Sequence, residues 1–481
     1  MKRTGLITAG VALTLATGSA AAQQQNPTRV GVQDPLDSSG IGSLNVAGSR
    51  ERVTSGTAFN PAISVILDGV YQNTFSGEAH GPAGFDDGHD HGHGHSHGHG
   101  HGGDDGFSLR ETEIAFSATV DRYFDAIAIL AVEEDHVEIE EAYITTRSLP
   151  AGLQLKAGKF LSDIGYINRQ HPHDWHFVDR PLVSEYLFGD HGLQDTGVQL
   201  SWLAPTPFYS RFGLELLQGS GGIANYVGDE QHTILGYAGD PGSEGPQRLR
   251  WRADNGLDDA SGPRLVTAFA KFAPDLGYSH AAQFGISGGY VSTWQNQEAH
   301  SSGRLETWDG DAWFVGLDAV YKYDSGRAYG HGNWVVQGEY FYREIDVDYA
   351  SRNFSDGSTL VPTISGGTSD EFSGTAKQDG VYLQTIYGFA PRWNAGLRAE
   401  ALGLTNNSLD PDRGSNRFES FGTSYRYAAQ VSFMPTEFSR IRLQANYMDY
   451  ADDNGNDHDH GAWTAMLQFN MSMGVHGAHD F

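Results

Sequence analysis

Hydrophobic and polar residues alternate with a period of two along much of the chain. In the stretch WTAMLQFNMSMGV, Trp463, Leu467 and Phe469 share one parity, while Thr464 and Gln468 fall on the other. Such a strand has one apolar and one polar face, because successive side chains point to opposite sides. The same split recurs in RWNAGLRAE (392–400), SYRYAAQVSF (424–433) and RIRLQANY (440–447). Alternation alone fits either a membrane barrel or a soluble β-sandwich.

Connection lengths separate these two folds. The expected strands span residues 60–72, 108–119, 122–132, 138–147, 152–160, 194–203, 209–217, 264–272, 282–293, 312–323, 333–344, 378–388, 392–402, 423–433, 437–449 and 461–475. Every second connection is a short turn, and most of the others are long: 73–107, 161–193, 218–263, 294–311, 345–377, 403–422 and 450–460. This order predicts an all-β fold over residues 60–481: a transmembrane antiparallel β-barrel of about sixteen strands, with short periplasmic turns and long external loops.

The two ends of the chain indicate where the barrel resides. Residues 1–22 carry two basic residues, a short apolar run and an Ala-x-Ala ending, which predicts a secretory signal peptide. Residues 23–59 are polar and rich in Gly and Ser, and we expect a short flexible periplasmic segment. The final residue, Phe481, is typical of chains handled by the outer-membrane assembly machinery. The expected location is the bacterial outer membrane, with its lipid as a partner.

Composition narrows the chemistry. The chain has 481 residues, a formal charge of -29 and no cysteine, so a bound metal must use nitrogen and oxygen ligands. We find neither a serine in a nucleophile-elbow setting nor an HExxH helix, and we do not expect an enzyme. No organic cofactor and no nucleic-acid partner are expected.

A histidine-rich stretch, GHDHGHGHSHGHGHGG, occupies residues 88–103 of the first predicted external loop. Its candidate metal ligands are His89, His91, His93, His95, His97, His99, His101 and Asp90. Neutral imidazole is a good ligand for Zn²⁺, Ni²⁺, Cu²⁺ and Co²⁺, and alternation with glycine lets many pairs of histidines close around one ion. Because a Gly-rich loop loses conformational entropy when it binds, we expect weak, exchangeable, multi-site affinity. The alternative is a solvated low-complexity loop with incidental metal affinity.

A second group of histidines lies in the 161–193 connection. His171, His173 and His176 occur within six residues, near Asp174 and Asp179. In sixteen-stranded porins the third loop folds inward and narrows the pore, so these residues could form a metal relay at a constriction. The stretch also has enough aromatic residues and prolines to be a packed loop whose histidines only form hydrogen bonds.

Arginines recur on the polar parity of the last strands. Arg398, Arg426, Arg440 and Arg442 are expected to line the pore, opposite Asp174 and Asp179. Such an arrangement would place a transverse electric field across the channel. The alternative is scattered charges that only solvate the wall.

Several segments together resemble a known family. These are NPAISVILDGVY (60–71), the block that begins GKFLSDIGYIN (158–168), the His-rich first loop and the ending GVHGAHDF. They are similar to bacterial outer-membrane proteins labelled zinc-regulated TonB-dependent outer-membrane receptors and, more broadly, to porins of the phosphate-selective O/P type. The resemblance implies a porin-type barrel, metal-linked import and a homotrimer. A TonB-dependent transporter needs a folded plug ahead of its barrel, whereas residues 23–59 are few and polar, so we do not expect TonB coupling.

The sequence thus predicts an outer-membrane channel for passive uptake of a divalent transition metal, foremost zinc, with the His-rich loop as the capture element. The alternatives are a general or anion-preferring porin whose loop binds metal incidentally, and a structural or adhesive barrel. Substitution of the four arginines is expected to separate the first two, because only an anion channel should depend on them.

Overall fold

The computed structural model describes residues 61–77, 81–85, 105–132, 136–228, 232–238, 247–253, 256–299, 304–353, 370–409, 418–451 and 461–474. Residues 1–22 and 23–59, the histidine-rich stretch 88–103 and Phe481 lie outside the described residues. The predictions made for them therefore stay predictions.

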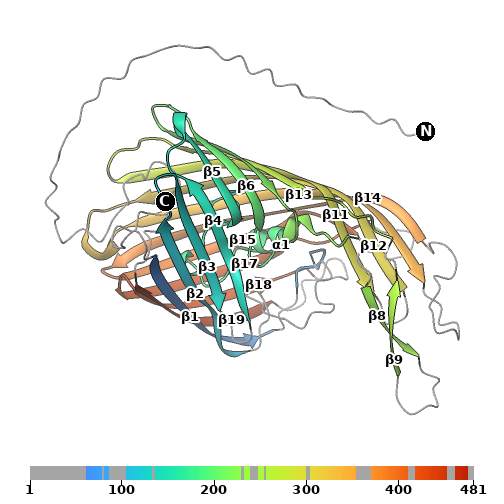
Figure 1. Ribbon diagram of the computed structural model, residues 1–481. Helices are drawn as coiled ribbons and strands as arrows, with labels where there is room; N and C mark the ends of the chain where they lie inside the picture. The colour runs from blue at the N-terminus through green and yellow to red at the C-terminus, as the bar shows by residue number, and fades with distance from the viewer. Residues whose placement is uncertain are drawn as a thin grey trace. The chain divides into compact units, whose positions relative to one another are not determined.

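Sixteen antiparallel strands close into one barrel (Figure 1). Each strand pairs with its neighbours in sequence, and β1 closes the ring by pairing with β19. The barrel strands are β1 (Ala62–Ser76), β2 (Gly106–Thr119), β3 (Phe124–Val132), β4 (Val137–Thr146), β5 (Leu153–Leu161), β6 (Gln194–Leu203), β7 (Tyr209–Leu217), β10 (Leu265–Ala273), β11 (His280–Ala299), β12 (Arg304–Tyr323), β13 (Trp334–Asn353), β14 (Asp370–Ala390), β15 (Trp393–Leu409), β17 (Ser424–Thr436), β18 (Ser439–Asp449) and β19 (Ala462–Gly474). The predicted fold and all the predicted strands are confirmed.

The two faces of the strands have opposite character. On β19, Leu467 faces outward and is 46% exposed, whereas the next residue, Gln468, faces inward and is 0% exposed. Exposed aromatic side chains gather near the short turns, among them Trp202, Phe389 and Trp393. An apolar outer band with aromatic residues at its edge is the surface that a barrel presents to lipid. The protein is a β-barrel of the bacterial outer membrane.

Several strands extend far beyond the length needed to cross a membrane. β11, β12 and β13 each have 20 residues, about twice the ~9–11 of a spanning strand. The predicted long loop at 294–311 is therefore wrong, because β11 and β12 stay paired as far as Ala299 and Leu305. Both described ends of the predicted loop at 345–377 are likewise strand, since β13 and β14 pair as far as Ser351 and Asp370. Beyond the membrane both faces of a hairpin can be polar, so these strand ends do not need an apolar face and were not recognised from the alternation.

Smaller elements lie in the connections, and the sequence reading missed them. β8 (His232–Ala238) and β9 (Gln247–Ala253) form a separate two-stranded sheet, and β16 (Phe418–Ser420) pairs with β15. Four 3₁₀ turns are η1 (Pro150–Gly152), η2 (Pro172–Asp174), η3 (Gly222–Ala224) and η4 (Ala328–Gly330). The α-helix, α1 (Leu182–Phe188), begins after Pro181 and ends at Gly189, whose φ of 93° suits glycine. Among the described residues, none of the helices is both long and apolar enough to cross a membrane.

Candidate functional site

The connection between β5 and β6, residues 162–193, runs through the inside of the barrel and is called here the lumen segment. Its backbone is hydrogen-bonded by inward-facing side chains from strands all round the ring. These are Arg110 on β2, Lys271 on β10, Glu339 and Arg343 on β13, Arg398 on β15, Arg426 on β17, and Arg440, Arg442 and Gln444 on β18. Because these strands lie on opposite sides of a closed barrel, the segment crosses the lumen, and Figure 1 shows its helix α1 within the ring of strands.

The carboxylate of Asp179 holds the middle of the lumen segment to β15, β17 and β18. Its Oδ1 accepts hydrogen bonds from Arg398 Nη2 and Gln444 Nε2, each at 2.6 Å. Its Oδ2 accepts one from Asn446 Nδ2 at 2.9 Å and lies 3.0 Å from Arg426 Nη1. The side chain is only 1% exposed. Since a buried charge is tolerated only when it is paired and hydrogen-bonded, Asp179 and its partners depend on one another.

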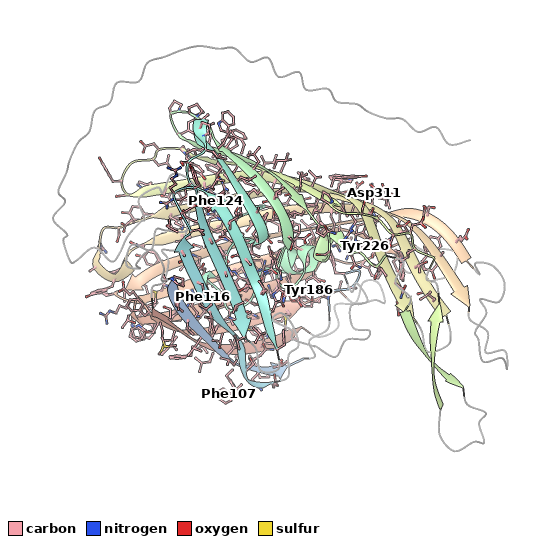
Figure 2. All side chains as sticks on the ribbon, in the orientation of Figure 1. Phe107, Phe116, Phe124, Tyr186, Tyr226 and Asp311 are labelled. Carbon is pink, nitrogen blue, oxygen red and sulfur yellow. The ribbon has the colours of Figure 1, made fainter. Side chains whose placement is uncertain are left out.

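Helix α1 gives the lumen segment an apolar anchor. Phe188 packs edge-on against Phe314 of β12 and Phe341 of β13, with ring centroids 5.2 and 4.9 Å apart. Leu187 is buried in the same cluster, and Tyr186, labelled in Figure 2, packs against it. The interior of this barrel thus contains a hydrophobic core around α1. The alternation of the strands did not indicate this core, because it predicted a polar inner face.

The start of the lumen segment is held by buried charges. The carboxylate of Glu339 accepts the backbone N–H groups of residues 166–167 at 2.9 and 2.8 Å. Asp163 accepts a hydrogen bond from Arg211 at 2.8 Å. Burial acts to raise the pKa of Asp163, but the charges of Lys156 and Arg211 outweigh it and hold that pKa well below its ordinary value. Asp163 is therefore a carboxylate over the whole physiological range.

Histidines and glutamates meet where the lumen segment passes β2 and β4. His171 Nδ1 lies 2.9 Å from Glu140 Oε1 and 3.5 Å from Glu113 Oε2. His171 Nε2 lies 2.8 Å from Glu141 Oε1. His173 Nδ1 lies 2.7 Å from the other oxygen of Glu113. Within the described ranges, Glu113, Glu140 and His171 are the one group whose ligand atoms could hold a metal ion, all lying within 4.8 Å of one another.

A β-bulge in β4 brings two consecutive glutamates to this cluster. Leu130 pairs with Ile139 and Ile129 pairs with Glu141, so Glu140 is the extra residue in the strand. Successive residues of a regular strand point to opposite faces, whereas a bulge re-aims a side chain. Both Glu140 and Glu141 are consequently buried inside the barrel.

The cluster carries an excess of negative charge, and this raises the pKa of both histidines. Burial acts to lower the pKa of His171, but the carboxylates of Glu140 and Glu113 outweigh it and raise that pKa well above its ordinary value. The pKa of His173 is also raised, since Asp174 and Glu113 outweigh the opposing effect of its burial. The surrounding carboxylates therefore favour positive charge at this position.

A small pocket adjoins the cluster. It is lined by Glu140, Leu161, Gln170, Pro172, Trp175, Arg180, Asp190 and His191. Glu140 belongs to both the cluster and the pocket wall. The pocket thus offers water or a small ion a place next to a carboxylate of the cluster.

The first residues of the connection between β1 and β2 return into the barrel mouth. Phe85 is only 2% exposed and packs edge-on against Tyr186 of the lumen segment, with ring centroids 6.2 Å apart. Asn406 Nδ2 donates a hydrogen bond to the carbonyl of Ala83 at 2.9 Å, and Gln378 Nε2 donates one to the carbonyl of Gly84. The chain that leads into the histidine-rich stretch is therefore anchored to the lumen segment.

The other predicted site residues occupy distinct positions. Arg398 and Arg426 contact Asp179 directly, so they do not face it across an open channel. Arg440 and Arg442 donate hydrogen bonds to the carbonyls of residues 173 and 175. The expected transverse field across the channel is thus replaced by direct ion pairs, because the lumen segment lies between the walls. The role of these residues in conduction stays a prediction.

His176 and Asp174 lie on the lumen segment but outside the group of potential metal ligands. The sequence reading missed Glu140, Glu141 and Phe85 as site residues. The one available signal was in the strand VEIEEAYITT, where two consecutive glutamates break an otherwise regular alternation. Phe85 had no signal, since a single aromatic residue in a Gly-rich loop does not reveal what it packs against.

The comparisons with known proteins bear on the family and the fold. No family model matches the sequence. A protein of Aquifex aeolicus (strain VF5), described as uncharacterized, is 33% identical over 386 residues, which cover 78% of this chain and 70% of that protein. The chain belongs to the same family as this Aquifex protein. Its description assigns no activity, so the function must be argued from the site.

Solved structures with a similar fold include outer-membrane proteins. The trimer form of OmpT from Vibrio cholerae gives a TM-score of 0.46 at 10% identity, covering 86% of this chain and 99% of that one. OprB from Pseudomonas putida gives 0.47 at 10% identity, covering 86% and 94%. An anion-selective porin from Comamonas acidovorans gives 0.44 at 9% identity, covering 86% and 99%. These values are too low to transfer a solute, a selectivity or an oligomeric state, and the expected homotrimer stays a prediction.

Proposed function

We propose that this protein is an outer-membrane channel for the passive uptake of a divalent transition metal ion, foremost Zn²⁺. The histidine-rich stretch captures the ion outside the cell, and the lumen segment controls its passage through the barrel. Selection comes from local concentration and ligand exchange, and it needs no covalent chemistry.

The observation that carries this proposal is the buried anchor of Phe85. The histidine-rich stretch begins three residues after Phe85, which packs on Tyr186 of the lumen segment. The chain between Phe85 and Asp105 can extend to at most about 70 Å, so a point at its middle reaches about 35 Å from its anchors. Captured ions are thus held within reach of the barrel mouth.

The chemistry of the two regions supports a transfer between them. Imidazoles on a Gly-rich chain bind ions weakly and release them readily, because the chain loses entropy on binding. Inside the barrel, His171 lies among Glu113, Glu140 and Glu141, which offer nitrogen and oxygen ligands under an excess of negative charge. A cation that leaves the histidine-rich stretch therefore meets buried carboxylates beside His171 inside the barrel.

The arginines give less support to an anion-preferring channel. Arg398 and Arg426 bind Asp179 and Glu400, and each also donates to a carbonyl of the lumen segment. Their charges are compensated inside the protein and are not displayed to a solute. Substituting them would also release the lumen segment, so the arginine test expected from the sequence does not separate metal from anion transport.

The test is Zn²⁺ entry into liposomes that contain the purified full chain, beside a neutral solute of similar size. One variant lacks residues 88–103, and a second keeps the length but has serine at the seven histidine positions 89–101. His280→Ser, on an exposed histidine at the start of β11, is the matched control. Tethered imidazoles present an effective concentration on the order of millimolar. Both variants of the histidine-rich stretch should therefore lose Zn²⁺ preference at micromolar Zn²⁺ and regain normal flux at millimolar Zn²⁺.

Three outcomes would contradict the proposal. Equal leakage of Zn²⁺ and the neutral solute, unchanged by either variant, would indicate a general porin. Faster passage of inorganic anions than of Zn²⁺ would indicate the anion-preferring alternative. A barrel that conducts nothing would favour a structural or adhesive role.

A further inference from the structure

We propose that His171, Glu140 and Glu113 together bind one divalent transition metal ion of the Zn²⁺ class inside the barrel. The biological role of this site rests on the proposed function, since the site would be where the transported ion binds inside the barrel. The geometry of the cluster supports a binding site independently of that role.

The spacing of the ligand atoms fits a zinc site. Zinc lies about 2.0–2.1 Å from histidine nitrogen and about 2.0–2.2 Å from carboxylate oxygen, so neighbouring ligands of a tetrahedral site are about 3.3–3.5 Å apart. His171 Nδ1 lies 2.9 Å from a Glu140 oxygen and 3.5 Å from a Glu113 oxygen. The first separation is shorter than the tetrahedral value and the second lies at its upper end, so a small rotation of Glu140 would bring both into range.

Two atoms of the cluster are buried without a hydrogen bond. His171 Nδ1 lies near two carboxylates, yet it forms no hydrogen bond of acceptable geometry, and neither does Glu140 Oε2. His171 is only 2% exposed and Glu140 only 6%. Buried polar atoms of native proteins are nearly always satisfied, and each exception calls for an explanation such as an ion. Both unsatisfied atoms belong to residues of one potential ligand group, and an ion bound at His171 Nδ1 would satisfy that nitrogen.

The remaining contacts match the outer shell of a metal site. A metal-binding histidine usually donates its second ring N–H to a carboxylate, which fixes the tautomer and turns the first nitrogen toward the ion. His171 Nε2 has this partner in Glu141, at 2.8 Å. The ligand Glu113 is oriented in the same way by His173, at 2.7 Å from its other oxygen. Glu141 and His173 are therefore positioning residues.

The bulge and the pocket complete the site. If β4 were regular, one of its two consecutive glutamates would point to the lipid, where a buried carboxylate is energetically unfavourable. The bulge instead places Glu140 at the ion and Glu141 beside Nε2 of His171. Glu140 also lines the small pocket with Gln170 and His191, so we expect water or an incoming ligand to reach the ion from the side of Glu140. A site with three protein ligands and one open position can exchange its ion, as transport requires.

The experiment is Zn²⁺ titration of the detergent-solubilised chain that lacks residues 88–103, by calorimetry and by Co²⁺ absorption. The deletion removes the seven histidines of the histidine-rich stretch, which would compete for the ion. We expect one ion per chain, undisplaced by millimolar Mg²⁺. Glu140→Gln and His171→Gln should each weaken binding at least about 100-fold, and Glu141→Gln about 10- to 100-fold.

Matched controls are Glu138→Gln on the same strand, whose carboxylate pairs with Lys159 outside the cluster, and His280→Gln. Both should bind as the parent does. No bound Zn²⁺ in the parent, or unchanged binding in Glu140→Gln and His171→Gln, would overturn the site. If those variants do not fold, X-ray absorption of the loaded parent decides: one Zn–N and two or more Zn–O distances are expected, and an all-oxygen shell or several imidazoles would overturn the proposal.

The two proposals fail in distinguishable ways. A barrel that leaks all solutes but binds one Zn²⁺ lost in Glu140→Gln would refute selective transport and leave the site standing. A barrel that selects Zn²⁺ through residues 88–103 and binds none after their deletion would refute the site and leave the transport proposal standing.

Discussion

Replacing Asp179 by alanine should release the lumen segment without unfolding the barrel. The substitution removes hydrogen-bond or ion-pair partners from Arg398, Arg426, Gln444 and Asn446 at once. Breaking a buried ion pair by removing one partner costs about 3–5 kcal/mol. Arg398 and Arg426 both retain Glu400, which places the expected cost toward the lower end of this range. The strand ladders do not involve the side chain, so the barrel itself should persist.

The free-energy cost of Asp179→Ala determines how much the fraction of barrels with a released lumen segment should rise. At about 1.4 kcal/mol per factor of ten, a cost of about 3–5 kcal/mol shifts the balance between seated and released segment roughly 150- to 4,000-fold. Single-channel conductance in planar bilayers, with flux of a neutral solute in liposomes, measures that shift as longer or larger openings. Asp125→Asn is the control, because this residue lies near the start of β3 and forms a partly exposed ion pair with Arg147 and a hydrogen bond with Thr119.

One result would refute this reasoning. If Asp179→Ala folds, as judged by its heat-dependent migration on gels, and its conductance and solute flux equal those of the parent, then the ion pairs at Asp179 do not hold the lumen segment in place.

Four further predictions concern the core, the lipid face and pH. Phe188→Ala removes the ring that packs on Phe314 and Phe341 and should cost about 3–5 kcal/mol, seen as increased neutral-solute flux. Leu467→Arg on the lipid face should cost about 2–4 kcal/mol and lower the folded fraction in vesicles, whereas Leu467→Ala should fold. Zn²⁺ capture by residues 88–103 should fade below about pH 6, where imidazole is protonated, and flux through the serine variant should show no such step. Because the pKa of Asp163 is held far below its ordinary value, its stabilising contribution is present above the unfolded pKa of about 3.9 and is lost only as pH falls through the lower folded value. Arg211→Gln removes the charge that pairs with Asp163 and should therefore shift the acid transition in conductance upward.

The pattern of the sequence was sufficient to predict the barrel. Period-two alternation, together with alternating short and long connections, predicted each strand from β1 to β19 that closes the ring. These features are local: a strand needs only its own residues to separate a lipid face from a lumen face. The same pattern underestimated β11 to β14, because beyond the membrane a hairpin no longer needs an apolar face to continue.

The sequence predicted the histidines of the candidate site but not their carboxylate partners. The cluster of His171 and His173 could be found as a local motif, and the placement of the 161–193 connection inside the barrel was one of two readings left open. Its carboxylate partners could not be found, since Glu113 and Glu141 are 58 and 30 residues from His171 along the chain. Only the closed barrel brings them together.

What the sequence determined by itself is therefore the number of strands and the face that most strand side chains occupy, whereas the metal-binding character of residues 88–103 stays a prediction. Only the tertiary structure decided that the lumen-facing charges are buried, and that Arg398 meets Asp179 from 219 residues away. The physical reason is that alternation follows from local backbone geometry. Contacts across a lumen depend instead on ring closure, on the bulge at Glu140 and on the path of one connection, and each of these is set by the sum of many distant interactions.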